Sequence, residues 1–199
     1  MNLRLLALAA LIACTAGPAP VVRAGATQSL PPDSVYHVEA SLAAASGQAL
    51  EWRALRGKPR VVAMFYASCR AVCPMIVESA RAVQRSLSEA ERGRVGFVLI
   101  SMDPRRDNPA ALAKLQTERH LDPASWLLLQ PGERDVRALA AVLGVRYREL
   151  ADGEFNHTTT LVLLDAEGRV LARTENVGAA GDKAFSDAVR AAATGRQAP

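Results

Sequence analysis

The sequence has few of the residues that most often cross-link a fold or carry chemistry. Its 199 residues include only three cysteines and three histidines, and aromatic residues make up 5% of the chain. Three cysteines exclude the dense disulfide framework of a small secreted domain, and a chain of this length can bury a sufficient apolar core without one. Length and composition therefore predict an ordinary globular domain.

Lysine is also scarce, since only 3 of the 24 basic residues are lysines and the other 21 are arginines. The net charge is +4, and the basic residues are scattered along the chain instead of forming blocks. A scattered, mild excess of positive charge is weak support for binding to nucleic acid. We therefore expect no nucleic-acid partner.

No hydrophobic run is long enough to cross a bilayer as a helix. The longest near the N-terminus, Leu5–Ala13, follows Arg4 and has the length of the apolar core of an export signal. Two processing sites are compatible with it. Val22-Arg23-Ala24 has small residues suited to cleavage before Gly25, and Leu11–Cys14 resembles a lipobox that would leave Cys14 lipidated.

The chain is thereby divided into three parts. Residues 1–24 are predicted to be a signal peptide or a lipoprotein signal, residues 25–34 a tether rich in small residues and proline, and residues 35–194 a single domain. Either form of processing predicts an exported, periplasmic protein. It would be soluble, or tethered to the membrane through a lipidated Cys14.

Within the domain, apolar runs alternate with helical patterns. Val61–Tyr66 and Val95–Ile100 are continuous apolar runs typical of strands buried on both faces. A hairpin is predicted over residues 160–172 and a last helix over about residues 182–193. We also expect a strand at Val35–Val38. This order predicts an α/β protein with a thioredoxin-like fold, in which helices cover both faces of a central β-sheet.

The remaining two cysteines lie where a buried strand gives way to a helix. Cys69 and Cys73 are separated by three residues, and Pro74 suits the first turn of a helix. The N-terminus of a helix favours a thiolate over a thiol, and the thiolate is the form that binds metal or attacks a disulfide. A structural disulfide over such a short loop would contribute little stability, so the pair is predicted to be chemically active.

A histidine could complete a metal site with this pair. His157 stands just before the strand predicted at Thr160–Leu164, and in a thioredoxin-like fold that segment lies beside the cysteine loop. Two thiolates and one imidazole suit a copper ion, Cu(I) or Cu(II), better than magnesium or calcium. Zinc accepts the same donors, although a structural zinc site would need a fourth ligand. His37 and His120 are expected to be structural or exposed.

Several short motifs follow in an order that resembles the SCO/SenC family over about residues 30–194. They are Arg56–Pro59, Phe65–Cys69, Cys73-Pro74, Ser101–Pro109, Trp126, Leu143–Tyr147, His157 and Leu163–Gly168. The resemblance implies that Cys69, Cys73 and His157 are the ligands of one copper ion. It also implies delivery of copper to a cytochrome c oxidase subunit or another periplasmic copper protein, or reduction of the cysteines that receive copper there.

The chain departs from the family pattern beside the histidine. Many members have Asp before the His and Ser after it, whereas this chain has Asn156 and Thr158. A neutral Asn156 compensates less of the charge of a bound cation. A second function also stays open, because Cys69 and Cys73 could act without a metal as a thiol-disulfide oxidoreductase. The copper chaperone is the preferred interpretation, since dithiol exchange does not require His157.

Overall fold

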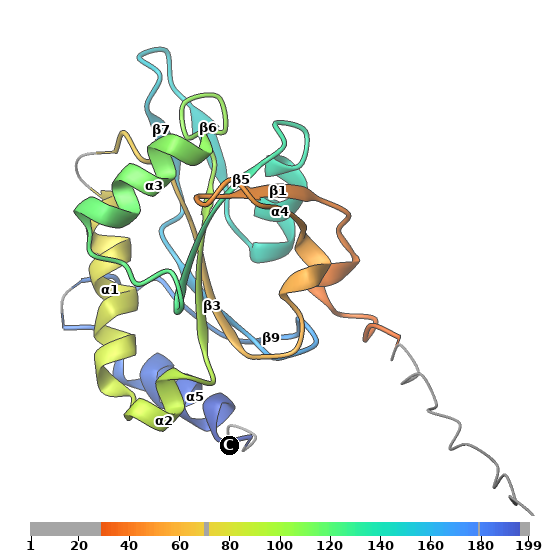
Figure 1. Cartoon of the computed structure of the whole chain (residues 1–199), viewed down its shortest axis with the longest axis vertical. Coiled ribbons are helices and arrows are strands. Elements are labelled where there is room, and N and C mark those ends of the chain that lie inside the picture. Colours follow the sequence, from red (N-terminus) through yellow and green to blue (C-terminus); the bar gives the residue numbers. More distant parts are fainter. Residues whose placement is uncertain (1–28, 70–71, 179, 196–199) are drawn as a thin grey trace, which may run out of the picture.

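The protein is described by a computed structural model that covers residues 29–69, 72–178 and 180–195. Seven strands form one mixed sheet in the order β2-β1-β5-β4-β3-β8-β9, and helices flank it on both faces (Figure 1). The predicted thioredoxin-like α/β fold is therefore confirmed. The predicted signal at residues 1–24, with Cys14, and the start of the tether lie outside the described residues.

The elements follow the chain in a regular order. They are η1 (Val35–His37), β1 (Ser41–Ala44), β2 (Ala49–Glu51), η2 (Trp52–Leu55), β3 (Arg60–Phe65), α1 (Val72–Ser86), α2 (Glu89–Arg92), β4 (Gly96–Ser101), α3 (Pro109–Glu118), β5 (Trp126–Pro131), α4 (Val136–Leu143), β6 (Tyr147–Glu149), β7 (Phe155–His157), β8 (Leu161–Leu164), β9 (Val170–Thr174) and α5 (Lys183–Ala193).

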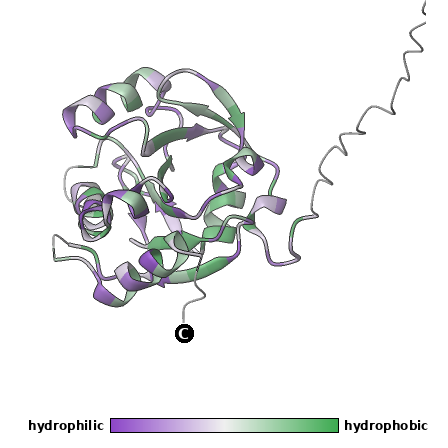
Figure 2. Ribbon diagram, turned by 60° about the horizontal axis from the view of Figure 1, so that its bottom comes forward, coloured by the Kyte–Doolittle hydropathy of each residue, from purple (hydrophilic) through white to green (hydrophobic). Residues whose placement is uncertain are grey.

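The middle of the sheet is the apolar core. β3 runs parallel to β4 and antiparallel to β8, and every residue of these three strands is buried. Accordingly, the central strands are mostly hydrophobic in colour in Figure 2, while the helices show one apolar and one polar side. Strands covered on both faces need continuous apolar runs, which is the pattern that Val61–Tyr66 and Val95–Ile100 display.

The crossover connections decide which face each helix covers. Right-handed crossovers from β3 to β4 and from β4 to β5 place α1 and α3 on the same face, while α4 returns across the opposite face (Figure 1). α5 packs beside α1 and against β9. Asn108 and Asp182 cap α3 and α5 through their side chains, as expected for residues that precede a helix.

The prediction of a strand at Val35–Val38 was wrong, because this segment forms the 3₁₀ turn η1. The Ser34 hydroxyl accepts a hydrogen bond from the Tyr36 N–H at 3.1 Å, which caps the turn. The Trp52 indole N–H donates to the Val35 carbonyl at 3.0 Å and holds it against η2. The apolar residues of this segment are therefore buried in a turn and not in a strand.

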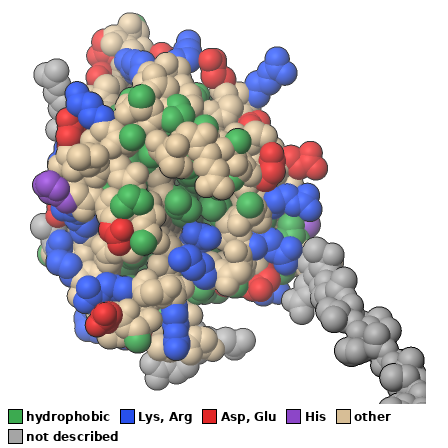
Figure 3. Space-filling model, in the orientation of Figure 1, with side chains coloured by type: hydrophobic (Ala, Val, Ile, Leu, Met, Phe, Trp, Pro, Cys, Tyr) green, Lys and Arg blue, Asp and Glu red, His purple; other side chains and the backbone are tan. Residues whose placement is uncertain are grey.

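Two observations on the described part of the chain concern possible partners and location. Basic side chains are spread over the face in Figure 3 and do not form one continuous patch. None of the helices between residues 29 and 195 that the structure describes is both long and apolar enough to cross a membrane.

Candidate metal centre

Three segments meet at the edge of the sheet where β3 and β4 end. Phe65 of β3 is aligned with Ser101 of β4, and the Met102 N–H donates to the Phe65 carbonyl at 2.8 Å. β8 runs antiparallel to β3, so the residues that precede Leu161 start from the same edge. The topology thus brings the loop carrying Cys69, the loop after β4 and the segment carrying His157 into one region.

Cys69 is nearly buried at this edge. Its exposed fraction is 8%, and its N–H donates to the Tyr66 carbonyl at 3.3 Å in a turn that follows β3. Helix α1 begins at Val72, two residues earlier than Pro74 had indicated. Cys73 is the second residue of this helix, but its side chain lies outside what the structure describes.

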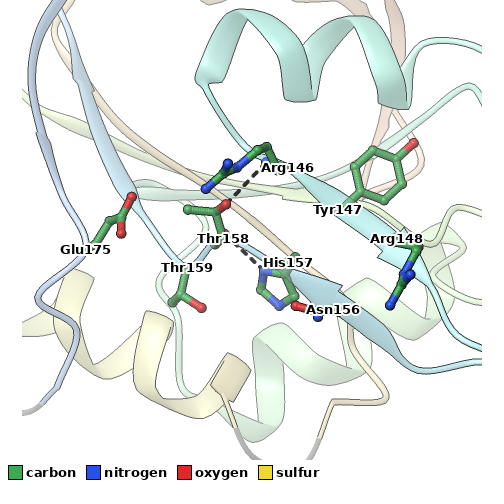
Figure 4. A pocket seen from close by; sticks show the side chains of 8 residues that line it. All are labelled: Arg146, Tyr147, Arg148, Asn156, His157, Thr158, Thr159 and Glu175. Carbon is green, nitrogen blue, oxygen red and sulfur yellow. Dashed lines mark hydrogen bonds between the residues drawn. The ribbon is translucent and has the colours of Figure 1, made fainter.

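His157 ends a short strand, although the sequence had indicated a loop. β7 pairs with β6 in an antiparallel ribbon that aligns His157 with Tyr147. The imidazole Nδ1 lies 3.1 Å from the Thr158 carbonyl oxygen (Figure 4). Because a carbonyl oxygen only accepts, Nδ1 carries the proton in this contact, and Nε2 then presents the lone pair that a metal requires.

A cavity of about 570 Å³ opens beside this histidine (Figure 4). Its lining consists of Arg146, Tyr147, Arg148, Asn156, His157, Thr158, Thr159 and Glu175. Arg148 is aligned with Asn156 across the ribbon, and both side chains are exposed. Among the described residues, neither Arg146 nor Arg148 forms an ion pair, so positive charge stands next to His157.

Tyr66 links the cysteine loop to the histidine ribbon. Its ring centroid lies 5.9 Å from that of His157, edge to face, and 5.1 Å from that of Phe155. Its hydroxyl donates to Glu154 Oε2 at 2.8 Å and also shares a hydrogen bond with the Cys69 side chain. Burial, followed by these two hydrogen bonds, raises the pKa of Tyr66 well above its ordinary value, so the phenol stays protonated.

A buried carboxylate holds the loop that carries Cys69 through hydrogen bonds. Asp107 is 2% exposed, and its Oδ2 accepts from the Ser101 hydroxyl at 2.6 Å and from the Ala67 N–H at 2.9 Å. Desolvation raises the pKa of Asp107, while the two hydrogen bonds lower it to a smaller extent. The loop after β4 therefore holds the residue two positions before Cys69.

The loop after β4 also contacts the β6–β7 ribbon, which carries His157. Arg106 donates to Asp103 and to the Gly153 carbonyl, and its guanidinium lies 6.0 Å from the centroid of the Phe155 ring. Arg105 pairs with Glu149 of β6 at 3.0 Å. The ion-pair partner of Asp103 is Arg106, not its neighbour Arg105.

Two of the three predicted ligands are thus placed around one tyrosine. Cys69 and His157 both contact Tyr66, whereas the full set with Cys73 remains a prediction because the Cys73 side chain is not described. Within the described residues alone, no group of three His, Cys, Asp or Glu side chains is arranged for a metal ion. A complete site around Cys69 and His157 therefore needs a further donor.

The other histidines and the methionines fit the sequence expectations. His37 is exposed, with its Nε2 2.8 Å from the Pro31 carbonyl oxygen, and His120 is exposed just after α3. Met64 and Met102 belong to the core, but Met75 is 43% exposed in the first turn of α1. Sequence reasoning missed Glu154, whose only signal was its position three residues before His157.

Comparisons with known proteins agree with the fold. A profile of the SCO1/SenC family matches residues 32–192. ScoI from Arabidopsis thaliana, solved with copper bound, has a TM-score of 0.66 at 21% identity over 76% of this chain and 94% of that one. ScoI from Bradyrhizobium japonicum, also with copper bound, has a TM-score of 0.65 at 22% identity, covering 77% and 97% of the two chains.

A third similar structure is that of a lipoprotein. The SCO1/SenC family lipoprotein from Bacillus anthracis has a TM-score of 0.65 at 22% identity, over 76% of this chain and 89% of that one. At such identities these structures establish a shared fold, and function has to be argued from the site. A search among curated proteins found no significant match.

Proposed function

The chain belongs to the SCO1/SenC family, and from this premise we propose that it binds one copper ion on Cys69, Cys73 and His157. The observation that carries the proposal is the meeting of Cys69 and His157 around Tyr66, although they are far apart in sequence. Thiolate and imidazole donors suit Cu(I), and an additional ligand would suit Cu(II). The Nδ1 contact to Thr158 leaves Nε2 as the donor atom.

The copper ion is cargo in this proposal. The protein delivers it to a subunit of cytochrome c oxidase or to another periplasmic copper protein, or it keeps reduced the cysteines that receive copper there. Export supports this role, because Leu5–Ala13 has the features of a signal core. The likeness to a lipoprotein from Bacillus anthracis favours a membrane tether through a lipidated Cys14.

The second candidate function is thiol-disulfide exchange by Cys69 and Cys73 without metal. It is favoured by the position of Cys69 between the end of β3 and the start of α1, where the backbone amides of a helix N-terminus stabilise a thiolate. Burial of Cys69 to 8% exposure and its contact with Tyr66 count against rapid exchange with a large disulfide substrate. Copper binding is therefore our principal proposal.

An anaerobic copper titration distinguishes the two functions. The reduced protein is titrated with Cu(I) against a competing chelator, beside His157→Ala and the control His37→Ala, which removes an exposed histidine elsewhere. We expect one tightly bound copper for the wild type and for His37→Ala, and at least about a tenfold loss of affinity for His157→Ala. Weak binding in all three proteins, or no effect of His157→Ala, would leave thiol exchange as the better function.

A further inference from the structure

Tyr66 is the one described side chain for which contacts with both Cys69 and His157 are recorded. It is 3% exposed and comes directly after β3. Its backbone carbonyl accepts from the Cys69 N–H, so the residue is also part of the turn that sets the cysteine. Because a buried tyrosine side chain has few accessible rotamers, its ring is held in one position.

The ribbon presents one side to this tyrosine. Phe155 and His157 are two residues apart on β7 and so project on the same face, where their rings lie 5.1 Å and 5.9 Å from the Tyr66 ring. Glu154 comes directly before β7 and accepts from the Tyr66 hydroxyl. This hydrogen bond joins the side chain of Tyr66 directly to the ribbon that carries His157.

We propose that Tyr66 is a positioning residue of the metal site and that its hydrogen bond to Glu154 holds the ribbon bearing His157 against the loop bearing Cys69. The inference rests on the proposed function and deepens it, because it assigns the control of ligand spacing to a pair outside the ligand set. Tyr66 itself is not proposed as a ligand, because its hydroxyl is engaged in the hydrogen bond to Glu154.

The residue next to His157 and the carboxylate bonded to Tyr66 are different residues of the ribbon. Next to His157, where many members of the family carry Asp, stands the neutral and exposed Asn156. Asn156 is aligned with Arg148 across the ribbon. Glu154 is the described carboxylate of this ribbon that hydrogen-bonds to the Tyr66 hydroxyl. Glu154 therefore connects the ribbon to the cysteine loop through Tyr66.

Removing the link should weaken copper binding without removing a ligand. Without this hydrogen bond the ribbon has more conformational freedom, which it must lose when copper binds. This loss of entropy lowers the affinity for copper. We expect Tyr66→Phe and Glu154→Gln each to lower Cu(I) affinity by about tenfold, which corresponds to about 1.4 kcal/mol. The double variant should lose little more than Tyr66→Phe alone, because Tyr66→Phe already removes the hydrogen bond that Glu154→Gln weakens by taking away the charge of its acceptor.

Two control variants match these changes in chemistry but lie outside the site. Tyr36→Phe removes another buried hydroxyl, which donates to the Leu55 carbonyl at 3.3 Å. Glu51→Gln removes another carboxylate that accepts from a hydroxyl, that of Ser41, at 3.1 Å. Both should bind copper within about twofold of the wild type, even where their thermal stability falls.

A second readout does not involve copper. The metal-free, reduced proteins are treated with iodoacetamide, and tryptic peptides are then followed by mass spectrometry. Cleavage after arginine places Cys69 in the peptide Val61–Arg70 and Cys73 in Ala71–Arg81, so the two alkylation rates are measured separately. We expect the alkylation rate of Cys69 to change several-fold in Tyr66→Phe and Glu154→Gln, and to stay at the wild-type rate in both controls.

The outcomes separate this inference from the proposed function. If the wild type binds no copper but Cys69 alkylation changes in both site variants, the function fails and the positioning role of Tyr66 stands. If the wild type binds copper and the site variants match the controls in affinity and alkylation, the inference is wrong and the function stands. Additive losses in the double variant would likewise overturn the proposed shared contact.

Discussion

Asp107 offers a sharp test of how the cysteine loop is held. Its carboxylate is buried with an exposed fraction of 2%, and one oxygen, Oδ2, accepts from both the Ser101 hydroxyl and the Ala67 N–H. Replacement by alanine removes the acceptor of both donors at once. Replacement by asparagine keeps an oxygen that can occupy the same place, so Asp107→Asn is the matched control.

The expected loss follows from these two hydrogen bonds. Leaving a buried donor without its acceptor costs about 1–3 kcal/mol, so two donors cost roughly 2–6 kcal/mol. Part of this is offset because the variant no longer buries an ionised carboxylate. We therefore expect Asp107→Ala to lower the free energy of unfolding by about 2–3 kcal/mol at neutral pH, and Asp107→Asn by less than half of that.

Urea unfolding at a series of pH values measures both effects. Desolvation raises the pKa of Asp107 above its ordinary value of 3.8, so the native protein holds this proton more tightly than the unfolded chain. The stability that this group contributes is full below that value and falls as the pH rises toward the native pKa. The free energy of unfolding of the wild type minus that of Asp107→Asn should therefore decline as the pH rises from below 3.8 toward the raised native pKa. A difference that grows with pH, or full stability of Asp107→Ala, would refute this reasoning.

Three further predictions test the fold and the site. Gly168→Ala should lower the stability of the protein in thermal unfolding by about 2–4 kcal/mol, because φ is +86° and a Cβ would lie 2.8 Å from Ser34 Oγ. The control Gly47→Ala places its Cβ in open space and should lower the stability by about 1 kcal/mol. Asn156→Asp should raise copper affinity a few-fold by adding a carboxylate next to His157, and added salt should reduce the gain; calorimetric titration at two salt concentrations tests this. Arg106→Ala should accelerate hydrogen exchange of the β6–β7 amides by about tenfold, whereas Arg134→Ala at an exposed loop should not.

The central part of the fold could be predicted because its physical pattern is simple. The continuous apolar runs that became β3 and β4 are required of strands buried on both faces, and Asn108-Pro109 marks the start of α3 by its chemistry. The edges could not be predicted in the same way. β1, β2, β6 and β7 have only three or four residues each, too few for a periodicity to emerge.

The sequence motifs identified the candidate ligands but not the residues that hold these ligands in position. Cys69 and His157 were identified from their motifs, and the topology places both at the same sheet edge. Glu154 was missed because its role depends on the geometry of the β6–β7 turn, which brings it to the Tyr66 hydroxyl. The burial of Asp107 and its contact with Ala67 likewise depend on long-range packing that one sequence does not reveal.

The most direct test of a copper site is X-ray absorption at the copper edge of the Cu(I)-loaded, reduced protein. A site formed by Cys69, Cys73 and His157 predicts two sulfur neighbours and one imidazole nitrogen, with the imidazole signal lost in His157→Ala. A spectrum without sulfur neighbours, or one that His157→Ala leaves unchanged, would contradict the proposed ligand set.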